Sequence, residues 1–252
     1  MTTKIHIHAD YTAYADFIRS IPEHAYPVGR VYCNRRNVVE STNIGGKDFV
    51  VKRYQVPIWF NRIAYTFLRK DKAQRAYENA QALAKLGILT PAPVAYIVQK
   101  HWRVFHTAWF VSLYMPYTPL FDFHRSVTDE GERTRLWEGV AQFMLQAHTQ
   151  GVYFRDNNGG NILVRREAEG FRFCIVDINR LRLGRVPTLD ESMCSFDQLG
   201  LDIPTLMQAI SYYAKARGFD FERCLHSLHR QREKRTKYLA RKRSLQRLFH
   251  LK

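Results

Sequence analysis

The chain has 252 residues, of which 46% are hydrophobic and 25% are charged; this composition suits one large domain or two small lobes and excludes global disorder, collagen-like repeats and a disulfide scaffold. No run of 18 apolar residues occurs, the four cysteines form no Cys-x-x-Cys pair, and residues 1–10 lack the apolar core of a secretory signal, so we expect a protein of the reducing cytoplasm. The formal net charge of +16 predicts a polyanionic partner, such as nucleic acid, an anionic lipid or a phosphorylated glycan.

The first 115 residues predict a β-rich lobe with one helix. Residues 43–48 indicate a hairpin turn, because Gly45 and Gly46 allow positive φ. A helix is expected over residues 72–86, with Gly87 ending it. Strands are expected in short segments rich in β-branched and aromatic residues, at residues 28–32, 38–41, 49–54, 94–98, 103–105 and 109–114.

The pattern changes after residues 115–119, where two prolines predict a hinge. Thr128 or Asp129 is expected to cap a helix that runs to about His148, and the chain is expected to be helical again from about Asp202. Between these helices, two short strands at residues 162–164 and 171–176 flank a polar turn.

The fold class is therefore expected to be α+β with two lobes. We expect a β-rich N-terminal lobe over residues 1–115, a mainly helical lobe over residues 116–228 and a basic tail over residues 229–252. A cleft between the lobes would be the default ligand site.

The tail holds ten Lys or Arg residues against one acidic residue, Glu233, and so carries +9 of the net charge of +16. The plain interpretation is a solvated terminal helix. The functional interpretation is attachment to an anionic membrane surface, since each basic residue near such a surface contributes about 1 kcal/mol and interleaved residues such as Leu239 can enter the headgroup region. Nucleic acid would use the same charges, so the tail alone does not choose between these partners.

The segment 151–164, GVYFRDNNGGNILV, contains Arg155-Asp156, four further residues and then Asn161. A later strand ends in Asp177. This order resembles the R-D-x4-N catalytic loop and the metal-binding Asp of kinases. Phosphoryl transfer needs a carboxylate to orient the acceptor hydroxyl, here Asp156, and hard oxygen ligands for Mg²⁺, here Asn161 and Asp177.

The β-rich half supplies a candidate partner for the phosphates. Lys52 lies in the apolar strand FVVKRY, from which an ammonium group can contact the α and β phosphates of ATP. Its usual carboxylate partner comes from the following helix, and Glu78 is the only acidic residue in the middle of that helix. An exposed Glu78 paired with Arg75 is the alternative.

Taken with IGGKDFVVKRY, GNILV and VDINRLRLG, these motifs make residues 28–250 similar to the bacterial lipopolysaccharide core kinases, the Kdo/heptose kinase group of the protein-kinase-like superfamily. The resemblance implies a two-lobed kinase fold, ATP with Mg²⁺, and phosphate transfer to an inner-core sugar of lipopolysaccharide at the cytoplasmic face of the inner membrane. It implies the same roles for Lys52, Glu78, Asp156, Asn161 and Asp177.

Three departures from kinase patterns stand out. Phe154 occupies the position where the family usually has His, two residues before the base, and Asp177 is followed by Ile178-Asn179-Arg180 rather than Phe-Gly. The turn between the first two strands has no glycine, so Arg35 and Arg36 are expected to cover the phosphates instead.

Two other functions remain open at the level of sequence. One is a kinase-like enzyme that acts on a protein or a small metabolite. The other is a non-catalytic protein that uses the fold to bind a polyanion such as RNA. Binding of ATP with Mg²⁺ and an acceptor screen would separate them from the leading hypothesis.

Overall fold

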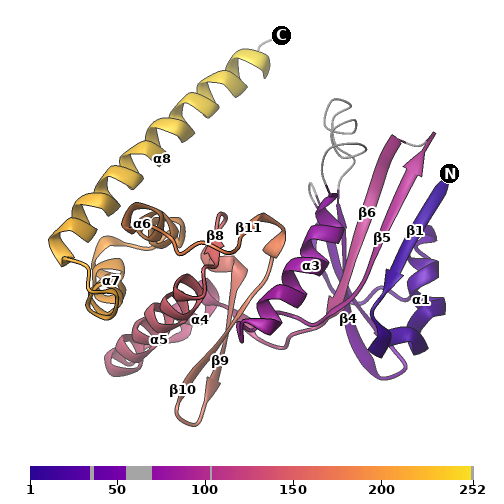
Figure 1. The fold of residues 1–252 in the computed structure, drawn as a ribbon, viewed down its shortest axis with the longest axis horizontal. Helices are drawn as coiled ribbons and strands as arrows, with labels where there is room; N and C mark the ends of the chain where they lie inside the picture. Colours follow the sequence, from indigo (N-terminus) through magenta and orange to yellow (C-terminus); the bar gives the residue numbers. More distant parts are fainter. Residues whose placement is uncertain (35–36, 55–69, 103, 251–252) are drawn as a thin grey trace. The chain divides into compact units, whose positions relative to one another are not determined.

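The computed structural model describes residues 1–34, 37–54, 70–102 and 104–250, apart from the side chains of residues 242 and 245–250. It divides into two compact units (Figure 1). Unit 1 comprises Met1–Pro116 together with Ile175–Asn179, and unit 2 comprises Tyr117–Cys174 and Arg180–Lys252. The fold is mixed helix and sheet, an antiparallel sheet followed by helices, as the α+β expectation requires.

Unit 1 is built on a six-stranded antiparallel sheet in the order β1-β5-β6-β4-β3-β2. The strands are β1 (Thr2–Ile7), β2 (Val31–Asn34), β3 (Asn37–Ile44), β4 (Lys47–Tyr54), β5 (Pro93–His101) and β6 (Val104–Leu113). The predicted hairpin is confirmed: Ile44 pairs with Lys47, and Gly45 and Gly46 both have positive φ. The strand predicted at residues 28–32 begins only at Val31.

Helices cover both faces of this sheet. Alternation along β4 sends Phe49 and Val51 to the face covered by the short α1 (Ala15–Ser20), with its flanking 3₁₀ turns η1 (Ala9–Tyr14) and η2 (Ile21–Glu23). Tyr54 packs on the other face against α3 (Lys72–Lys85), the helix predicted from the sequence. Asp71 caps α3 by accepting from the Ala73 and Gln74 amides, and Gly87 follows it with φ +68°. Lys52 therefore lies on the α3 face of the sheet.

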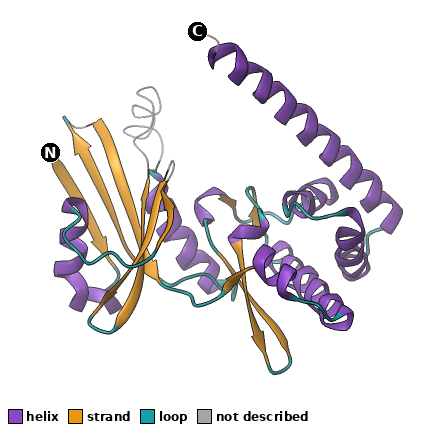
Figure 2. Cartoon of the chain, turned by 180° about the vertical axis from the view of Figure 1, so that it is seen from behind, coloured by secondary structure: helices purple, strands orange, loops and turns teal. Residues whose placement is uncertain are grey.

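Unit 2 is mainly helical (Figure 2). Its helices are α4 (Leu120–Ser126), α5 (Glu130–Thr149), α6 (Leu189–Gln198), α7 (Ile203–Arg217) and α8 (Phe221–His250). Short strands form the sheets β10-β9-β7 and β11-β8, from β7 (Thr118–Pro119), β8 (Tyr153–Phe154), β9 (Ile162–Glu167), β10 (Gly170–Ile175) and β11 (Leu181–Arg182). Two 3₁₀ turns are η3 (Gly159–Asn161) and η4 (Ile178–Arg180).

The core of unit 2 forms around α5. Asp129 caps this helix, and five apolar residues along one side of it are buried: Leu136, Val140, Phe143, Met144 and Ala147. His148 is fully buried, and its Nδ1 lies 2.7 Å from the Tyr213 hydroxyl on α7. Arg217 donates to that hydroxyl at 2.8 Å. Burial, with the nearby Arg217 charge, lowers the pKa of His148 to about 3.

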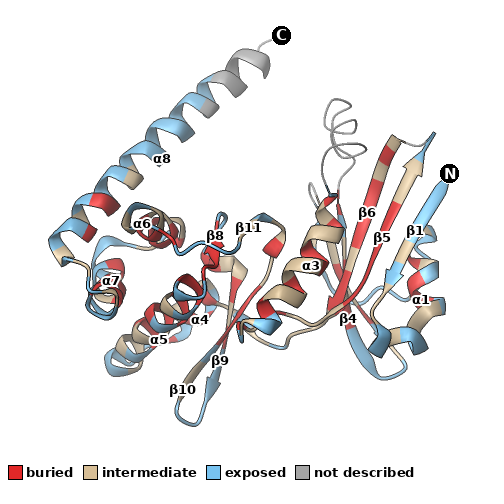
Figure 3. Cartoon of the chain, viewed as in Figure 1, coloured by how far each residue is buried: buried red, intermediate tan, exposed pale blue. Residues whose placement is uncertain are grey.

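Helix α8 contains the basic segment 229–252 as the continuation of a helix that begins at Phe221. Its first turns pack on α6 through the buried residues Cys224, Ser227 and Leu228, and most of its later residues are exposed (Figure 3). Within the part of the chain that the structure describes, no helix combines the length and apolar character needed to cross a membrane.

Candidate active site

Lys52 and Asp177, which are 125 residues apart in the chain, meet in unit 1. Lys52 Nζ donates to Asp177 Oδ1 at 2.6 Å. The Lys52 side chain is 14% exposed and the Asp177 side chain 33%. A largely buried ammonium group is costly to desolvate unless it has a charged partner, so this ion pair accounts for the position of Lys52 in an otherwise apolar strand.

The segment Ile175–Asn179 is fastened to unit 1 by three hydrogen bonds on either side of Asp177. The Ile175 amide donates to the Leu89 carbonyl at 3.0 Å, and the Thr90 hydroxyl donates to the Ile175 carbonyl at 2.8 Å. Asn79 on α3 donates its Nδ2 to the Ile178 carbonyl at 2.7 Å. The backbone on both sides of Asp177 is thus held by the loop that precedes β5 and by helix α3.

Asp177 itself has φ +56°, in the left-handed region. Non-glycine residues are uncommon there, and such conformations gather at functional sites, where the surrounding structure holds them in place. The strand predicted to end in Asp177 ends earlier: β10 stops at Ile175, and Asp177 lies two residues later, in a turn. Asn179 donates to Asp177 Oδ1 at 2.5 Å and completes the turn.

The aromatic ring of Tyr54 packs beneath the Lys52 ammonium group. Lys52 Nζ lies 5.4 Å from the centre of the Tyr54 ring, within the range of a cation–π contact. Burial raises the pKa of the Tyr54 phenol, and the Asp177 charge raises it further. Tyr54 therefore stays neutral, and its ring supplies a fixed, desolvated surface under Lys52.

Glu78 does not form the predicted pair with Lys52. Its carboxylate binds Lys70 at 2.8 Å and Gln74 at 3.0 Å, and its side chain is 39% exposed. The physical reason is helical phase: α3 buries Tyr77 against the sheet and directs Asn79 to Ile178, so Glu78 turns toward the residues that precede the helix. Asp177 provides the carboxylate that Lys52 contacts.

Arg35 and Arg36, predicted to cover the phosphates, lie outside the described residues.

In unit 2, the segment between β8 and β9 brings Asp156 and Asn161 together. Asn161 donates its Nδ2 to the Asp156 carbonyl at 3.0 Å, and its own amide donates to the Asn158 carbonyl at 2.7 Å. Asn158 accepts from the Gly160 amide. The four residues between Asp156 and Asn161 thus form a tight turn. Because Asn161 uses its Nδ2 in this turn, its Oδ1 remains available to coordinate a metal ion.

Asn157, which the sequence reasoning missed, anchors this turn. It is fully buried; its amide donates to Gln198 Oε1 at 2.8 Å, and its Nδ2 donates to the Ser195 carbonyl at 3.0 Å, both from α6. Its place next to Asp156 was the only signal in the sequence. A buried polar side chain held by two such bonds fixes the loop more firmly than packing alone would.

Phe154 replaces the usual His with an apolar support. It is buried and stacks on Phe143 of α5, with ring centres 6.1 Å apart and planes 8° from parallel. It also pairs with Leu181 across the β8–β11 ladder. The strand that leads into Asp156 is therefore held by hydrophobic contacts.

The Asp156 side chain is 48% exposed, and Arg180 lies beside it, with Nη1 3.4 Å from Asp156 Oδ2. An accessible carboxylate can reach an acceptor hydroxyl. The guanidinium group of Arg180, itself 66% exposed, adds a positive charge next to the position where that acceptor would bind.

The donors fit a magnesium site in kind. Asp177 offers a carboxylate oxygen and Asn161 an amide oxygen, and Mg²⁺ typically takes one or two protein oxygens together with phosphate oxygens and waters. No cluster of three or more His, Cys, Asp or Glu side chains able to hold a metal occurs among the residues described. The structure thus brings the predicted residues together as two pairs, Lys52 with Asp177 in unit 1 and Asp156 with Asn161 in unit 2.

Comparisons with known proteins identify the family and a similar fold. A model of the lipopolysaccharide kinase (Kdo/WaaP) family matches residues 30–192, more than half of the chain. A solved structure of WaaP in complex with acyl carrier protein is similar in fold, with a TM-score of 0.61 and 17% sequence identity over 92% of this chain and 98% of that chain. A search of curated proteins gives no match.

Proposed function

Because the chain belongs to the lipopolysaccharide kinase (Kdo/WaaP) family and is a kinase, we propose that it transfers the γ-phosphoryl group of ATP to a hydroxyl of an inner-core sugar of lipopolysaccharide, either Kdo or heptose. The observation that carries the proposal is the 2.6 Å contact between Lys52 and Asp177. It joins the two charges that phosphoryl transfer places nearest the nucleotide phosphates.

Each residue has a role that follows from its contacts. When ATP binds, Lys52 leaves its ion pair with Asp177 and contacts the α and β phosphates. The Tyr54 ring packs under the ammonium group and restrains its position. Asp177 and Asn161 would each offer an oxygen ligand to Mg²⁺, and the ion would supply positive charge for the phosphate oxygens. Glu78 and the two arginines, Arg35 and Arg36, stay predictions as contributors to nucleotide binding.

Asp156 acts on the acceptor. Its carboxylate accepts a hydrogen bond from the sugar hydroxyl and takes the proton as the new oxygen–phosphorus bond forms and the bond to the leaving ADP breaks. The transition state is loose, so the main contribution of Asp156 is orientation. Arg180 restrains this carboxylate and offers a positive charge to an anionic acceptor such as Kdo, which carries a carboxylate.

Because lipopolysaccharide is a membrane glycolipid, the proposed function requires a membrane-binding surface, and α8 is the candidate. Lys234, Lys237, Arg241 and Arg243 are exposed on this helix, together with Tyr238 at 64% exposure. Basic residues with interleaved aromatic and aliphatic side chains are typical of helices that lie on anionic membranes. We place the protein at the cytoplasmic face of the inner membrane, peripherally bound through α8.

The test compares phosphate transfer from labelled ATP to core lipopolysaccharide by the wild type and by Asp156→Asn. The variant should lose about 10²–10⁴-fold in turnover and keep its nucleotide affinity. Asp122→Asn makes the same chemical change at an exposed carboxylate of α4 and should keep full activity. Equal transfer by Asp156→Asn and wild type would remove Asp156 from the mechanism, and transfer only to soluble sugars, proteins or metabolites would refute the acceptor.

A further inference from the structure

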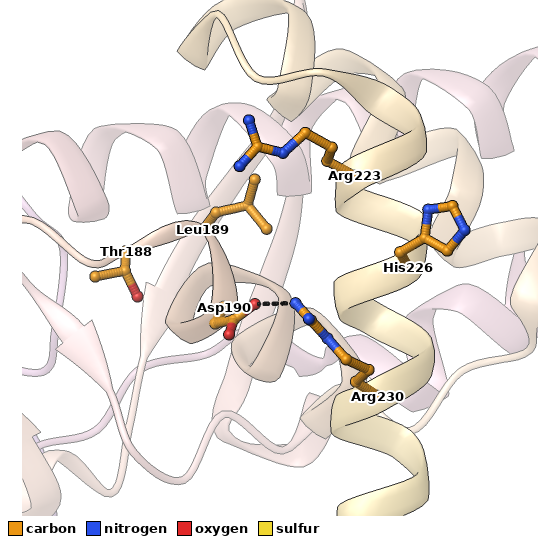
Figure 4. A pocket seen from close by; sticks show the side chains of 6 residues that line it. All are labelled: Thr188, Leu189, Asp190, Arg223, His226 and Arg230. Carbon is orange, nitrogen blue, oxygen red and sulfur yellow. Dashed lines mark hydrogen bonds and ion pairs between the residues drawn. The ribbon is translucent and has the colours of Figure 1, made fainter.

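A cavity of about 550 Å³ lies between the start of α6 and the first turns of α8, within unit 2. That volume is within the range of small-molecule sites in proteins. Figure 4 shows the side chains that line it: Thr188, Leu189 and Asp190 from the start of α6, and Arg223, His226 and Arg230 from α8. None of the residues assigned to phosphoryl transfer is among them.

The positive charge of the cavity comes from one face of α8. Arg223, His226 and Arg230 are spaced three, four and seven residues apart, so they lie along one side of the helix. The single carboxylate in the lining, Asp190, already accepts hydrogen bonds from the Ser227 hydroxyl and from Arg230 Nη2, the latter at 3.0 Å. The Ser227 bond holds the pKa of Asp190 below its usual value, with Arg230 and Lys234 adding to the effect.

Arg223 is the basic residue of the lining whose side chain is not neutralised by Asp190. Its backbone amide caps onto Asp220, but its guanidinium group has no hydrogen bond or ion pair with any residue that the structure describes. Figure 4 shows the group extending from α8 toward Leu189. The lining therefore holds two guanidinium groups and one carboxylate, and the surplus positive charge is on a planar group suited to bidentate contacts with oxyanions.

We propose that this cavity, the α6–α8 pocket, binds a phosphate group through Arg223, with Arg230 and His226 as further donors. The pocket lies where the exposed basic part of α8 begins, and Lys234, Lys237 and Arg241 continue the same helical face. A phosphate of a lipid headgroup and a phosphate of a soluble phosphorylated sugar present the same chemistry to these residues. The inference concerns a site separate from the proposed phosphoryl transfer and does not depend on it.

The experiment follows the His226 imidazole by NMR in the full-length protein. The probes are glycerol 3-phosphate, which represents a soluble phosphomonoester, and phosphatidylcholine vesicles with and without phosphatidic acid. The variant is Arg223→Gln, and the matched control is Arg125→Gln, which removes the same charge from an exposed position of α4 in the same unit, outside the pocket. Equal melting temperatures and circular dichroism establish that all three proteins are folded, and Arg223→Lys supplies a second variant that keeps the charge but loses the bidentate geometry.

In the wild type and in Arg125→Gln, the phosphomonoester should shift the His226 signals with the same affinity. In Arg223→Gln the affinity should fall about tenfold or more, since a charge-assisted bidentate contact is lost. Displacement of glycerol 3-phosphate by phosphatidic acid vesicles identifies a lipid headgroup as the ligand, and its absence identifies a soluble phosphate. No response of His226 to any probe would overturn the proposal, as would equal losses in Arg223→Gln and Arg125→Gln, which would show diffuse attraction to charge.

Discussion

The contact between Lys52 and Asp177 predicts a measurable coupling free energy. Lys52→Met keeps the aliphatic stem over Tyr54 and removes the charge, and Asp177→Asn keeps a residue type that tolerates the left-handed backbone at φ +56°. A charge-assisted hydrogen bond contributes about 1.5–3 kcal/mol when well buried. Because the Asp177 side chain is 33% exposed, solvent screens one side of the pair, and we expect a coupling of about 1–2 kcal/mol.

The assay is a double-mutant cycle: urea unfolding of the wild type, both single variants and the double variant. Hydrogen exchange in peptides from β3 to β6 assigns the transition to unit 1, since a chain of two units need not unfold in one step. The exposed pair Arg19–Asp16, at 3.1 Å in the same unit, serves as the control and should couple by less than about 0.5 kcal/mol. A Lys52–Asp177 coupling no larger than that of the control would refute the reasoning that burial and distance make this pair energetically distinct.

Three further predictions concern unit 2. The pKa of His148 is lowered to about 3 in the folded state and is about 6.5 in an unfolded chain, so the free energy of unfolding should be full above pH 6.5 and fall by up to about 1.4 kcal/mol per pH unit below it. In urea unfolding between pH 7 and 4, His148→Gln should flatten this dependence on pH. An unchanged slope would contradict the assignment to His148. Gly139→Ala places a Cβ 2.8 Å from the Phe173 ring, so it should lower the free energy of unfolding by about 1–3 kcal/mol. Gly131→Ala, on the same helix, meets only ordinary van der Waals contacts and should leave the melting temperature unchanged or raise it. Asp197 is 1% exposed and accepts from Arg232 at 2.9 Å and Arg235 at 3.3 Å, which anchors α8. Because solvent reaches both guanidinium groups once the carboxylate is gone, Asp197→Ala should cost about 1–2 kcal/mol and speed protease cleavage after Arg232. Glu169→Ala, in an exposed turn, should change neither.

The sequence predicted the parts of the fold that depend on local patterns. The hairpin at residues 43–48 follows from two adjacent glycines, and α5 follows from apolar residues repeating over about three turns, with Asp129 as its cap. The short α1 and α6 were not predicted, because six and ten residues give little periodicity. For α6 a signal was present: Thr188 and Glu191 form a capping box.

The candidate site divides in the same way. Lys52 and Asp177 were named from their strands, and the structure places them in contact. The partner of Glu78 was not predictable, since a shift of one residue along a helix turns a side chain by about 100° and the neighbouring Asn79 took the inward position. Asn157 and the left-handed turn at Asp177 depend on contacts with α6, α3 and β5 neighbours that are distant in sequence, so no local pattern could indicate them.

The length of α8, 30 residues, affects the stability of the helix itself. Beyond Arg235 its backbone keeps only the hydrogen bonds of its own turns, and its side chains from Thr236 to Arg241 face solvent. A helical stretch without tertiary neighbours is marginal in water, and successive turns that carry like charges repel one another. Anionic groups bound along α8 would therefore stabilise its helical conformation, because they would reduce the repulsion between its basic side chains.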